Sequence, residues 1–188
     1  TATQVDITGQ GDLRLQDTTG GQYVALQANG TTTTHTLTFP AAQGAADTFL
    51  TNNGSGALTW TAPDKTIQMV VIDFATALTT GNGKFYFHVP STLNGFNIVD
   101  VHAEVITAPA GSTIIIQLHN LTATADILTT LLTIDANETG SDTAAAAAVI
   151  SGSEDDLTTN DVLRVDIDQV GSSTAGSGLI VTMICRLP

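Results

Sequence analysis

Two stretches in the second half of the chain alternate strictly between apolar and polar residues. Residues 99–105 place valine or alanine at every odd position, and residues 163–168 place leucine, valine and isoleucine at theirs. Successive side chains of a β-strand point to opposite faces, so both patterns predict strands that are buried on one face. The four apolar residues of 99–105 are expected to share that face. Residues 114–118 and 179–185 are more continuously apolar, which is typical of strands covered on both faces.

Short clusters of glycine, asparagine, proline and serine separate these predicted strands. They occur at residues 81–83, 94–95, 109–111 and 171–173. Such residues favour tight turns. Around eight strands in about 125 residues predict an all-β fold, with an antiparallel, jelly-roll-like β-sandwich over residues 64–188. The alanine-rich segment 143–150 fits a close-packed strand and a helical turn equally well, and its pattern leaves both open.

The first 63 residues differ from the rest of the chain in the length of their predicted strands and in the composition of their turns. Their strand-like pieces are very short and lie between turns rich in glycine, asparagine and threonine. Even a globular domain of about 60 residues is only marginally stable, and this segment has few apolar residues to bury. We therefore predict that residues 1–63 form an extended β arm for assembly or attachment, stabilised by a partner surface. The residues expected to contact that surface are Leu13, Leu15, Tyr23, Leu26, Leu37, Phe39, Phe49, Leu50 and Trp60.

The charge balance excludes several classes of partner. The 188 residues include 18 Asp and Glu against 5 Lys and Arg, which gives a net charge of −13. Five scattered cations cannot form the basic stripe that phosphate contacts require, so we expect no nucleic-acid partner. No apolar run reaches the roughly 18 residues of a membrane-spanning helix, so we expect no membrane partner. Hydrophobic residues make up 42% of the chain, too many for a disordered protein.

The known sequence patterns of enzymes and cofactor sites are missing. The sequence contains no phosphate-binding loop, no dinucleotide-binding glycine pattern and no Gly-x-Ser-x-Gly nucleophile motif. We therefore predict a non-enzymatic protein with no catalytic residues and no cofactor. The single cysteine, Cys185, lies in an apolar run, which predicts a buried thiol rather than a reactive one.

Two groups of polar residues have the composition of metal sites. Asp100, His102 and Glu104 share one face of a predicted strand, where a divalent ion such as Zn²⁺ would find ligands. The simpler interpretation is the solvent face of a half-buried strand, and we predict no bound metal. Carboxylates at 154–156 and at Asp161, or Asp166 with Asp168, are candidate Ca²⁺ ligands, but their spacing does not match an EF-hand loop.

Several motifs carry a resemblance to bacteriophage proteins. Residues 13–17 (LRLQD), 20–28 (GGQYVALQA), 37–40 (LTFP) and 50–60 (LTNNGSGALTW) resemble a linker-like module of tailed-bacteriophage fibre and virion-surface proteins. Residues 89–95 (VPSTLNG), 132–139 (LTIDANET), 160–170 (NDVLRVDIDQV) and 178–181 (GLIV) resemble a β-sandwich domain of phage structural proteins. Together the two resemblances extend over nearly the whole chain.

The resemblance implies a homotrimeric, non-enzymatic component of the virion surface that is assembled in the host cytoplasm. The expected function is capsid decoration (a cement protein) or a short head fibre, with the arm docked on the major capsid protein or another virion protein. The alternative is a tail-fibre or receptor-binding protein that contacts the host surface. A polysaccharide-degrading virion enzyme ranks lowest, because no catalytic motif supports it.

The distribution of charge along the chain indicates how the arm and the sandwich are expected to be oriented on the particle. Residues 1–63 contain four acidic residues and one basic residue, a net charge of −3, whereas residues 64–188 contain fourteen and four, a net charge of −10. A nearly uncharged arm suits packing against partners, and an acidic domain resists aggregation at high local concentration. We therefore expect the arm to face the particle and the sandwich to face outward.

Overall fold

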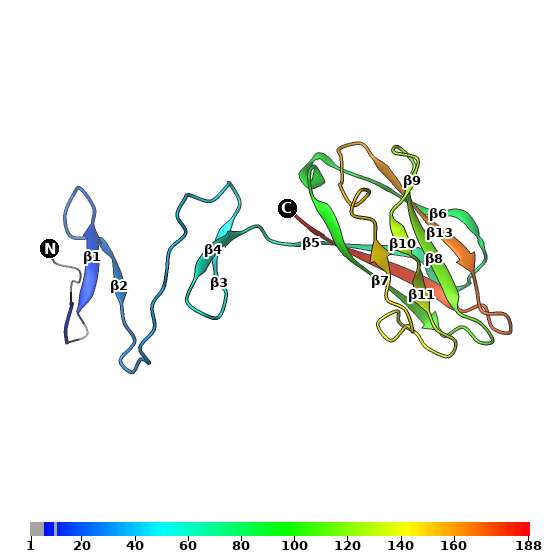
Figure 1. The fold of residues 1–188 in the computed structure, drawn as a ribbon, viewed down its shortest axis with the longest axis horizontal. Helices are drawn as coiled ribbons and strands as arrows, with labels where there is room; N and C mark the ends of the chain where they lie inside the picture. The colour runs from blue at the N-terminus through cyan, green and yellow to red at the C-terminus, as the bar shows by residue number, and fades with distance from the viewer. Residues whose placement is uncertain (1–5, 10) are drawn as a thin grey trace. The chain divides into compact units, whose positions relative to one another are not determined.

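The computed structural model describes residues 6–9 and 11–188 (Figure 1). Tertiary contacts divide the chain into two units. One unit contains the described residues up to Gln43 together with Leu50–Trp60, and the other contains Gly44–Phe49 and Thr61–Pro188. The described part of the chain has strands and one short 3-10 helix, η1 (Ser91–Leu93), but no α-helix. None of these segments is a helix long and apolar enough to cross a membrane.

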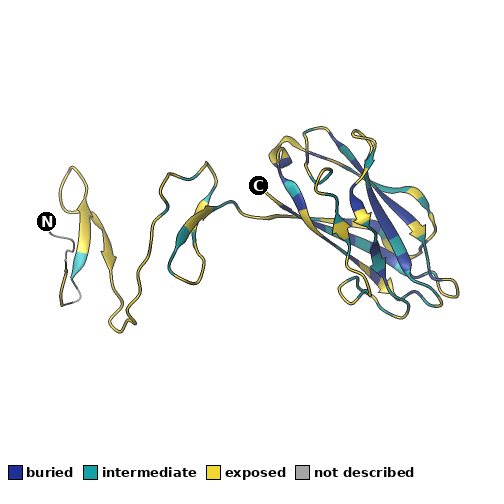
Figure 2. Ribbon diagram, viewed as in Figure 1, coloured by how far each residue is buried: buried dark blue, intermediate teal, exposed yellow. Residues whose placement is uncertain are grey.

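The N-terminal region contains two short β-hairpins. Strands β1 (Asp12–Gln16) and β2 (Tyr23–Gln27) pair antiparallel, and strands β3 (Phe49–Asn52) and β4 (Leu58–Thr61) form a second two-stranded sheet. No residue described between positions 6 and 68 is buried, as the yellow and teal colours of Figure 2 show. The prediction that this part of the chain is all-β is confirmed.

Two antiparallel sheets enclose the hydrophobic core of the C-terminal region. The first sheet has the order β5 (Lys65–Ala77), β14 (Ser177–Arg186), β7 (Asn97–Thr107). The second has the order β11 (Leu132–Ile134), β8 (Ile114–Asn120), β13 (Val162–Gln169), β6 (Gly81–His88), with β9 (Ala125–Asp126) paired to β8. Strands β10 (Leu128–Thr130) and β12 (Val149–Ile150) pair with each other.

The connectivity of these strands is that of a jelly roll. Strands β5 to β8 alternate between the two sheets, and the last strand, β14, lies between β5 and β7. The free side of β7 is covered by two irregular pieces of chain: Thr139 and Ser141 bond to its C-terminal half, and Asp155 and Leu157 bond near its start. The predicted antiparallel, jelly-roll-like sandwich is therefore confirmed.

The alternating patterns place the apolar residues of each strand in the core. The three apolar side chains of β13 within 163–168 are buried, as are four of β14, including Cys185. Burial raises the pKa of the Cys185 thiol to about 11, which keeps it protonated and unreactive at neutral pH. The prediction of a buried cysteine is confirmed.

One residue of the alternating stretch 99–105 lies on the unexpected face. Val101, Ala103 and Val105 are buried, but Val99 is 40% exposed and its neighbour Ile98 takes the core position. The cause is a β-bulge: Ile184 pairs with Asp100 and the next residue, Cys185, pairs with Ile98, so Val99 has no partner on β14. A bulge adds one residue and reverses the alternation at that point. The prediction that Val99 shares the buried face was therefore wrong.

Most of the alanine-rich segment, residues 143–148, forms neither a strand nor a helical turn. Residues 143–148 are turns, bends and irregular chain, and regular structure resumes only with the short strand β12. The segment is held at its start by Ala144 N–H, which donates to Ser141 O (3.2 Å), and Ala145 N–H, which donates to Asp135 Oδ2 (2.9 Å). With most of its alanines exposed, the segment has no apolar face whose burial would stabilise a helix.

Gly178 in β14 provides a test of the packing between the strands of the first sheet. It has φ of +63°, and a Cβ atom there would lie 2.7 Å from Phe74 Cα and 2.8 Å from Ile106 Cγ1. We predict that Gly178→Ala lowers the free energy of unfolding by more than about 1 kcal/mol, because it adds both backbone strain and a clash. Gly152→Ala is the control, since that glycine has open space and no positive φ. Equal urea midpoints for the two variants would contradict the prediction.

Candidate functional site

The β1–β2 hairpin has one wholly aliphatic face. In its register Leu13 pairs with Leu26 and Leu15 pairs with Val24. Directly paired residues project to the same side of a sheet, so these four side chains form one surface. Their exposed fractions run from 49% to 69%. We call this set the aliphatic face of the hairpin.

The opposite side of the hairpin is polar. Arg14 lies 4.4 Å from the centre of the Tyr23 ring, and its Nε donates to both carboxylate oxygens of Asp12 at 2.9 Å. Tyr23 therefore lies on the other side from the leucines with which the sequence grouped it. Val24, which sequence reasoning missed, takes its place beside Leu15.

The turn between β1 and β2 fixes this register. The carboxylate of Asp17 accepts hydrogen bonds from Thr19 Oγ1 (2.9 Å) and Gly20 N–H (2.8 Å), and Asp17 N–H donates to Gln22 O (3.1 Å). Gly20 and Gly21 both have positive φ, a conformation that suits glycine. A shift of one residue would move the aliphatic side chains of one strand to the polar side, so the turn determines which residues form the aliphatic face.

The remaining predicted contact residues also lie on the surface. Thr38 N–H donates to Gly56 O and Leu58 N–H to Thr38 O, both at 2.9 Å, which joins the segment around Thr38 to the start of β4. Trp60 Nε1 donates to Ala42 O at 2.9 Å and leaves its ring partly exposed. The five predicted contact residues in this part of the chain, all exposed, are Leu37, Phe39, Phe49, Leu50 and Trp60.

The strand face with the candidate metal ligands is occupied by a histidine–carboxylate cluster. His102 Nδ1 lies 2.8 Å from Asp142 Oδ1, and Nε2 lies 3.0 Å from Asp100 Oδ2. His102 and Glu104 also line a surface hollow with Gln68 and other residues of the first sheet. Both ring nitrogens point at carboxylates, which suits a protonated ring with two N–H donors rather than a metal ligand. Within residues 6–9 and 11–188, no group of three His, Cys, Asp or Glu is arranged to hold a metal ion.

The candidate calcium ligands are engaged by neighbouring protein groups. Asp161 is buried, and its Oδ2 accepts from Asn120 Nδ2 at 3.0 Å and from Thr158 N–H at 3.3 Å. It shares a hollow with Glu154 and Asp156. Asp155 instead accepts from Asn97 Nδ2 at 3.0 Å. Asp155 therefore does not join Glu154, Asp156 and Asp161 as one set of ligands.

A row of polar side chains crosses the outer face of the second sheet. Arg164 on β13 lies directly between Tyr86 on β6 and His119 on β8, and His119 pairs in turn with Asp126 on β9. We call Tyr86, Arg164, His119 and Asp126 the polar row. Sequence reasoning did not select these four residues, because their alignment depends on the register of four strands.

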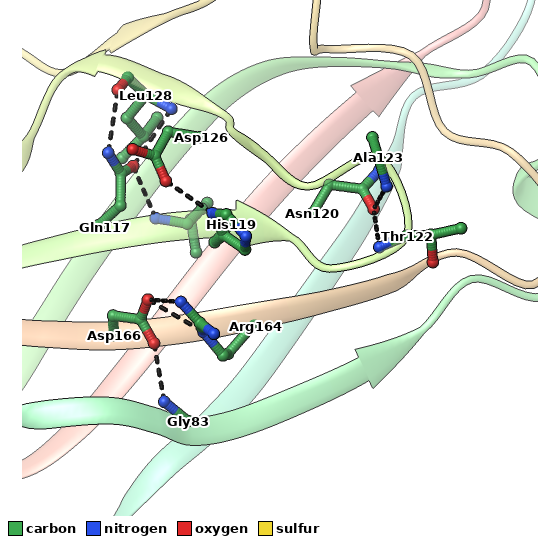
Figure 3. Close-up of polar contacts among 11 residues, drawn as sticks. Gly83, Gln117, His119, Asn120, Thr122, Ala123, Asp126, Leu128, Arg164 and Asp166 are labelled. Carbon is green, nitrogen blue, oxygen red and sulfur yellow. Dashed lines mark hydrogen bonds and ion pairs between the residues drawn. The ribbon is translucent and has the colours of Figure 1, made fainter.

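Two side chains of the polar row, Arg164 and His119, each contact a carboxylate, as Figure 3 shows. Arg164 donates to Asp166 Oδ2 from Nε (3.0 Å) and Nη2 (2.7 Å), and Gly83 N–H donates to Asp166 Oδ1 at 2.7 Å. Hydrogen bonding to Asp166 is the main cause that raises the pKa of Arg164. His119 Nδ1 lies 2.7 Å from Asp126 Oδ1. Both carboxylate oxygens of Asp166 therefore accept hydrogen bonds from the protein, and Asp166 does not join Asp168 as a calcium ligand.

The histidine cluster on β7 predicts a pH dependence of stability. Burial alone would lower the pKa of His102, but the hydrogen bonds and charges of Asp142 and Asp100 outweigh it and raise the pKa. A raised pKa in the folded state stabilises the protein below the unfolded value of about 6.5, and this stabilisation is lost as pH rises through the folded value. Because the pairs are exposed, we expect less than about 1 kcal/mol.

The measurement is the urea midpoint of the wild type and of His102→Gln at pH 5.5 and pH 8. The wild type should gain stability relative to the variant at the lower pH. In an NMR titration, Asp142→Asn should lower the pKa of His102, because Asp142 supplies both a hydrogen bond and a charge. A wild type that is favoured more at pH 8 would contradict the assignment.

No family model matches the sequence, and no curated protein or solved structure is significantly similar to it. The function must therefore be argued from the aliphatic face of the hairpin, from the polar row and from the distribution of charge.

Proposed function

We propose that this protein is a structural component of a bacteriophage virion surface that assembles through its N-terminal arm. The observation that carries the proposal is the burial of the two regions. None of the residues described in the arm is buried, whereas the sandwich has a continuous core of fully buried apolar side chains. A segment with exposed aliphatic and aromatic side chains and no core of its own needs a partner surface.

The aliphatic face of the hairpin is the part of the arm best suited to an interface. A two-stranded hairpin is at best marginally stable in water and gains stability by packing its apolar face on another surface. Leu13, Leu15, Val24 and Leu26 provide such a face with no charged group in it. We propose that it packs in a homotrimer or on the major capsid protein, so that assembly and ordering of the arm occur together.

The charge distribution supports display of the sandwich away from the particle. The sandwich region has a net charge of −10, and neighbouring copies at high density would repel one another. All three arginines of the chain are paired with its own carboxylates, Arg14 with Asp12, Arg164 with Asp166 and Arg186 with Asp64. The uncharged aliphatic face avoids that repulsion, so contacts between copies cost least there.

A pair of matched substitutions in β1 tests the interface. Leu15→Glu places a carboxylate on the aliphatic face, whereas Gln16→Glu places one on the opposite side of the same strand. We expect the first to weaken self-association or particle binding by at least about tenfold and the second to have little effect. Analytical ultracentrifugation of both variants measures the change. Equal effects of the two substitutions would contradict a face-specific interface.

A deletion tests whether the sandwich folds without the arm and whether assembly requires the arm. A chain that lacks residues 1–63 should still fold, because the buried core begins at Met69, but it should neither self-associate nor bind virions stripped of the protein. The full chain should bind those virions and raise the temperature at which they disrupt. If the shortened chain did not fold, the proposed independence of the sandwich from the arm would be contradicted. Binding of the full chain to host cells but not to virions would contradict the decoration function.

A further inference from the structure

The polar row lies on the sandwich and serves no purpose in the proposed assembly function. Its four side chains come from adjacent strands, which lie about 4.8 Å apart. The row therefore extends across the sheet as a line of regularly spaced groups. Tyr86 is 56% exposed on the outer face of the second sheet, and it lies on β6, which ends the sheet order beside β13.

Two groups of the row, Arg164 and His119, are held in place by carboxylates before any ligand arrives. The carboxylate of Asp166 is only 5% exposed and fixes the guanidinium of Arg164 through two donors. The Tyr86 hydroxyl lies beside Gly83, in space that a Cβ atom at that position would enter. His119 is oriented by Asp126. Fixed side chains lose little conformational entropy on binding.

The row retains hydrogen-bonding capacity that the protein does not use. A guanidinium has five N–H donors, and Arg164 directs only those of Nε and Nη2 to Asp166. In the part of the chain that the structure describes, Arg164 Nη1, His119 Nε2 and the Tyr86 hydroxyl have no protein hydrogen-bond partner. The exposed carboxylate of Asp126 can accept further hydrogen bonds. Donors and acceptors thus lie along one line beside an aromatic ring.

We propose that the polar row binds a neutral, hydroxyl-rich polysaccharide, independently of the assembly function of the arm. Sugar hydroxyls both donate and accept, which matches a row that offers Arg, His and Tyr donors beside an Asp acceptor. The apolar C–H face of a sugar ring packs on an aromatic ring such as that of Tyr86. A row that spans four strands suits an extended chain of sugars, which could contact the partly exposed Arg164 and His119 (18% and 17%) together with Tyr86 and Asp126.

Charge selects a neutral polysaccharide over an acidic one. The single cation of the row, Arg164, is already neutralised by Asp166, and Asp126 adds a negative charge. Asp168 follows on the same strand, and its pKa is raised mainly by burial and further by the charges of Asp166 and Asp126. A polyanion would meet this local charge and the net charge of −10 of the whole region.

The test uses the full-length protein and immobilised polysaccharides. Biolayer interferometry against dextran, mannan, galactan and xylan, with polygalacturonate as the acidic counterpart, compares the wild type with Tyr86→Ala. Phe74→Ala is the matched control, because Phe74 is also an exposed aromatic residue, at 51%, but lies on the other sheet. Thermal unfolding of each variant verifies that it is folded.

We expect the wild type and Phe74→Ala to bind at least one neutral polysaccharide equally, and Tyr86→Ala to bind it at least about tenfold more weakly. His119→Gln provides a second variant that leaves the Arg164–Asp166 pair intact and should also weaken binding. The proposal is overturned if the wild type binds none of the four neutral polysaccharides, if it binds only polygalacturonate, or if Tyr86→Ala binds as tightly as Phe74→Ala. None of these results depends on whether the arm assembles.

Discussion

The burial of strand β14 between β5 and β7 is the interaction on which the sandwich depends. Its inward side chains, Leu179, Val181, Met183 and Cys185, are fully buried. The strand follows the other strands of the domain in the sequence, and it pairs Cys185 with Lys65 at the start of the domain. The first sheet therefore cannot form until the whole domain is present, and contacts of such long sequence separation make folding slow.

Among its described residues, the N-terminal region has no buried core that could supply comparable stability. Its hairpins have hydrogen bonds, a fixed turn at Asp17 and a defined register, but their apolar side chains stay in water. Local hydrogen bonds contribute little net stability, because the unfolded chain forms similar bonds with water. The structure of the arm is thus specified locally, while its stability must come from burial against a partner. This separation of shape from stability underlies the proposed assembly function.

The fold could be predicted from the sequence wherever the alternation of apolar and polar residues along a strand is enough to determine which side chains enter the core. Alternation in 163–168 places its apolar residues in the core, and the spacing of the turns indicates a sandwich. Alternation fails at Val99, because a bulge depends on the partner strand and leaves no local signal. The alanines of 143–148 have high helix propensity, but propensity without an apolar face to bury does not produce a helix.

The candidate sites were less predictable than the fold, because each depends on register between strands. Tyr23 and Val24 are neighbours in the sequence, and only the pairing of Leu15 with Val24 determines which of the two joins the aliphatic face. In the same way, Arg164 and Tyr86 are 78 positions apart and become neighbours only through the pairing of β13 with β6. Composition can identify the residues capable of contact, whereas the backbone register determines which of them act together. Register is set by turns and bulges, so a single glycine such as Gly83 constrains the polar row although it contributes no side chain to it.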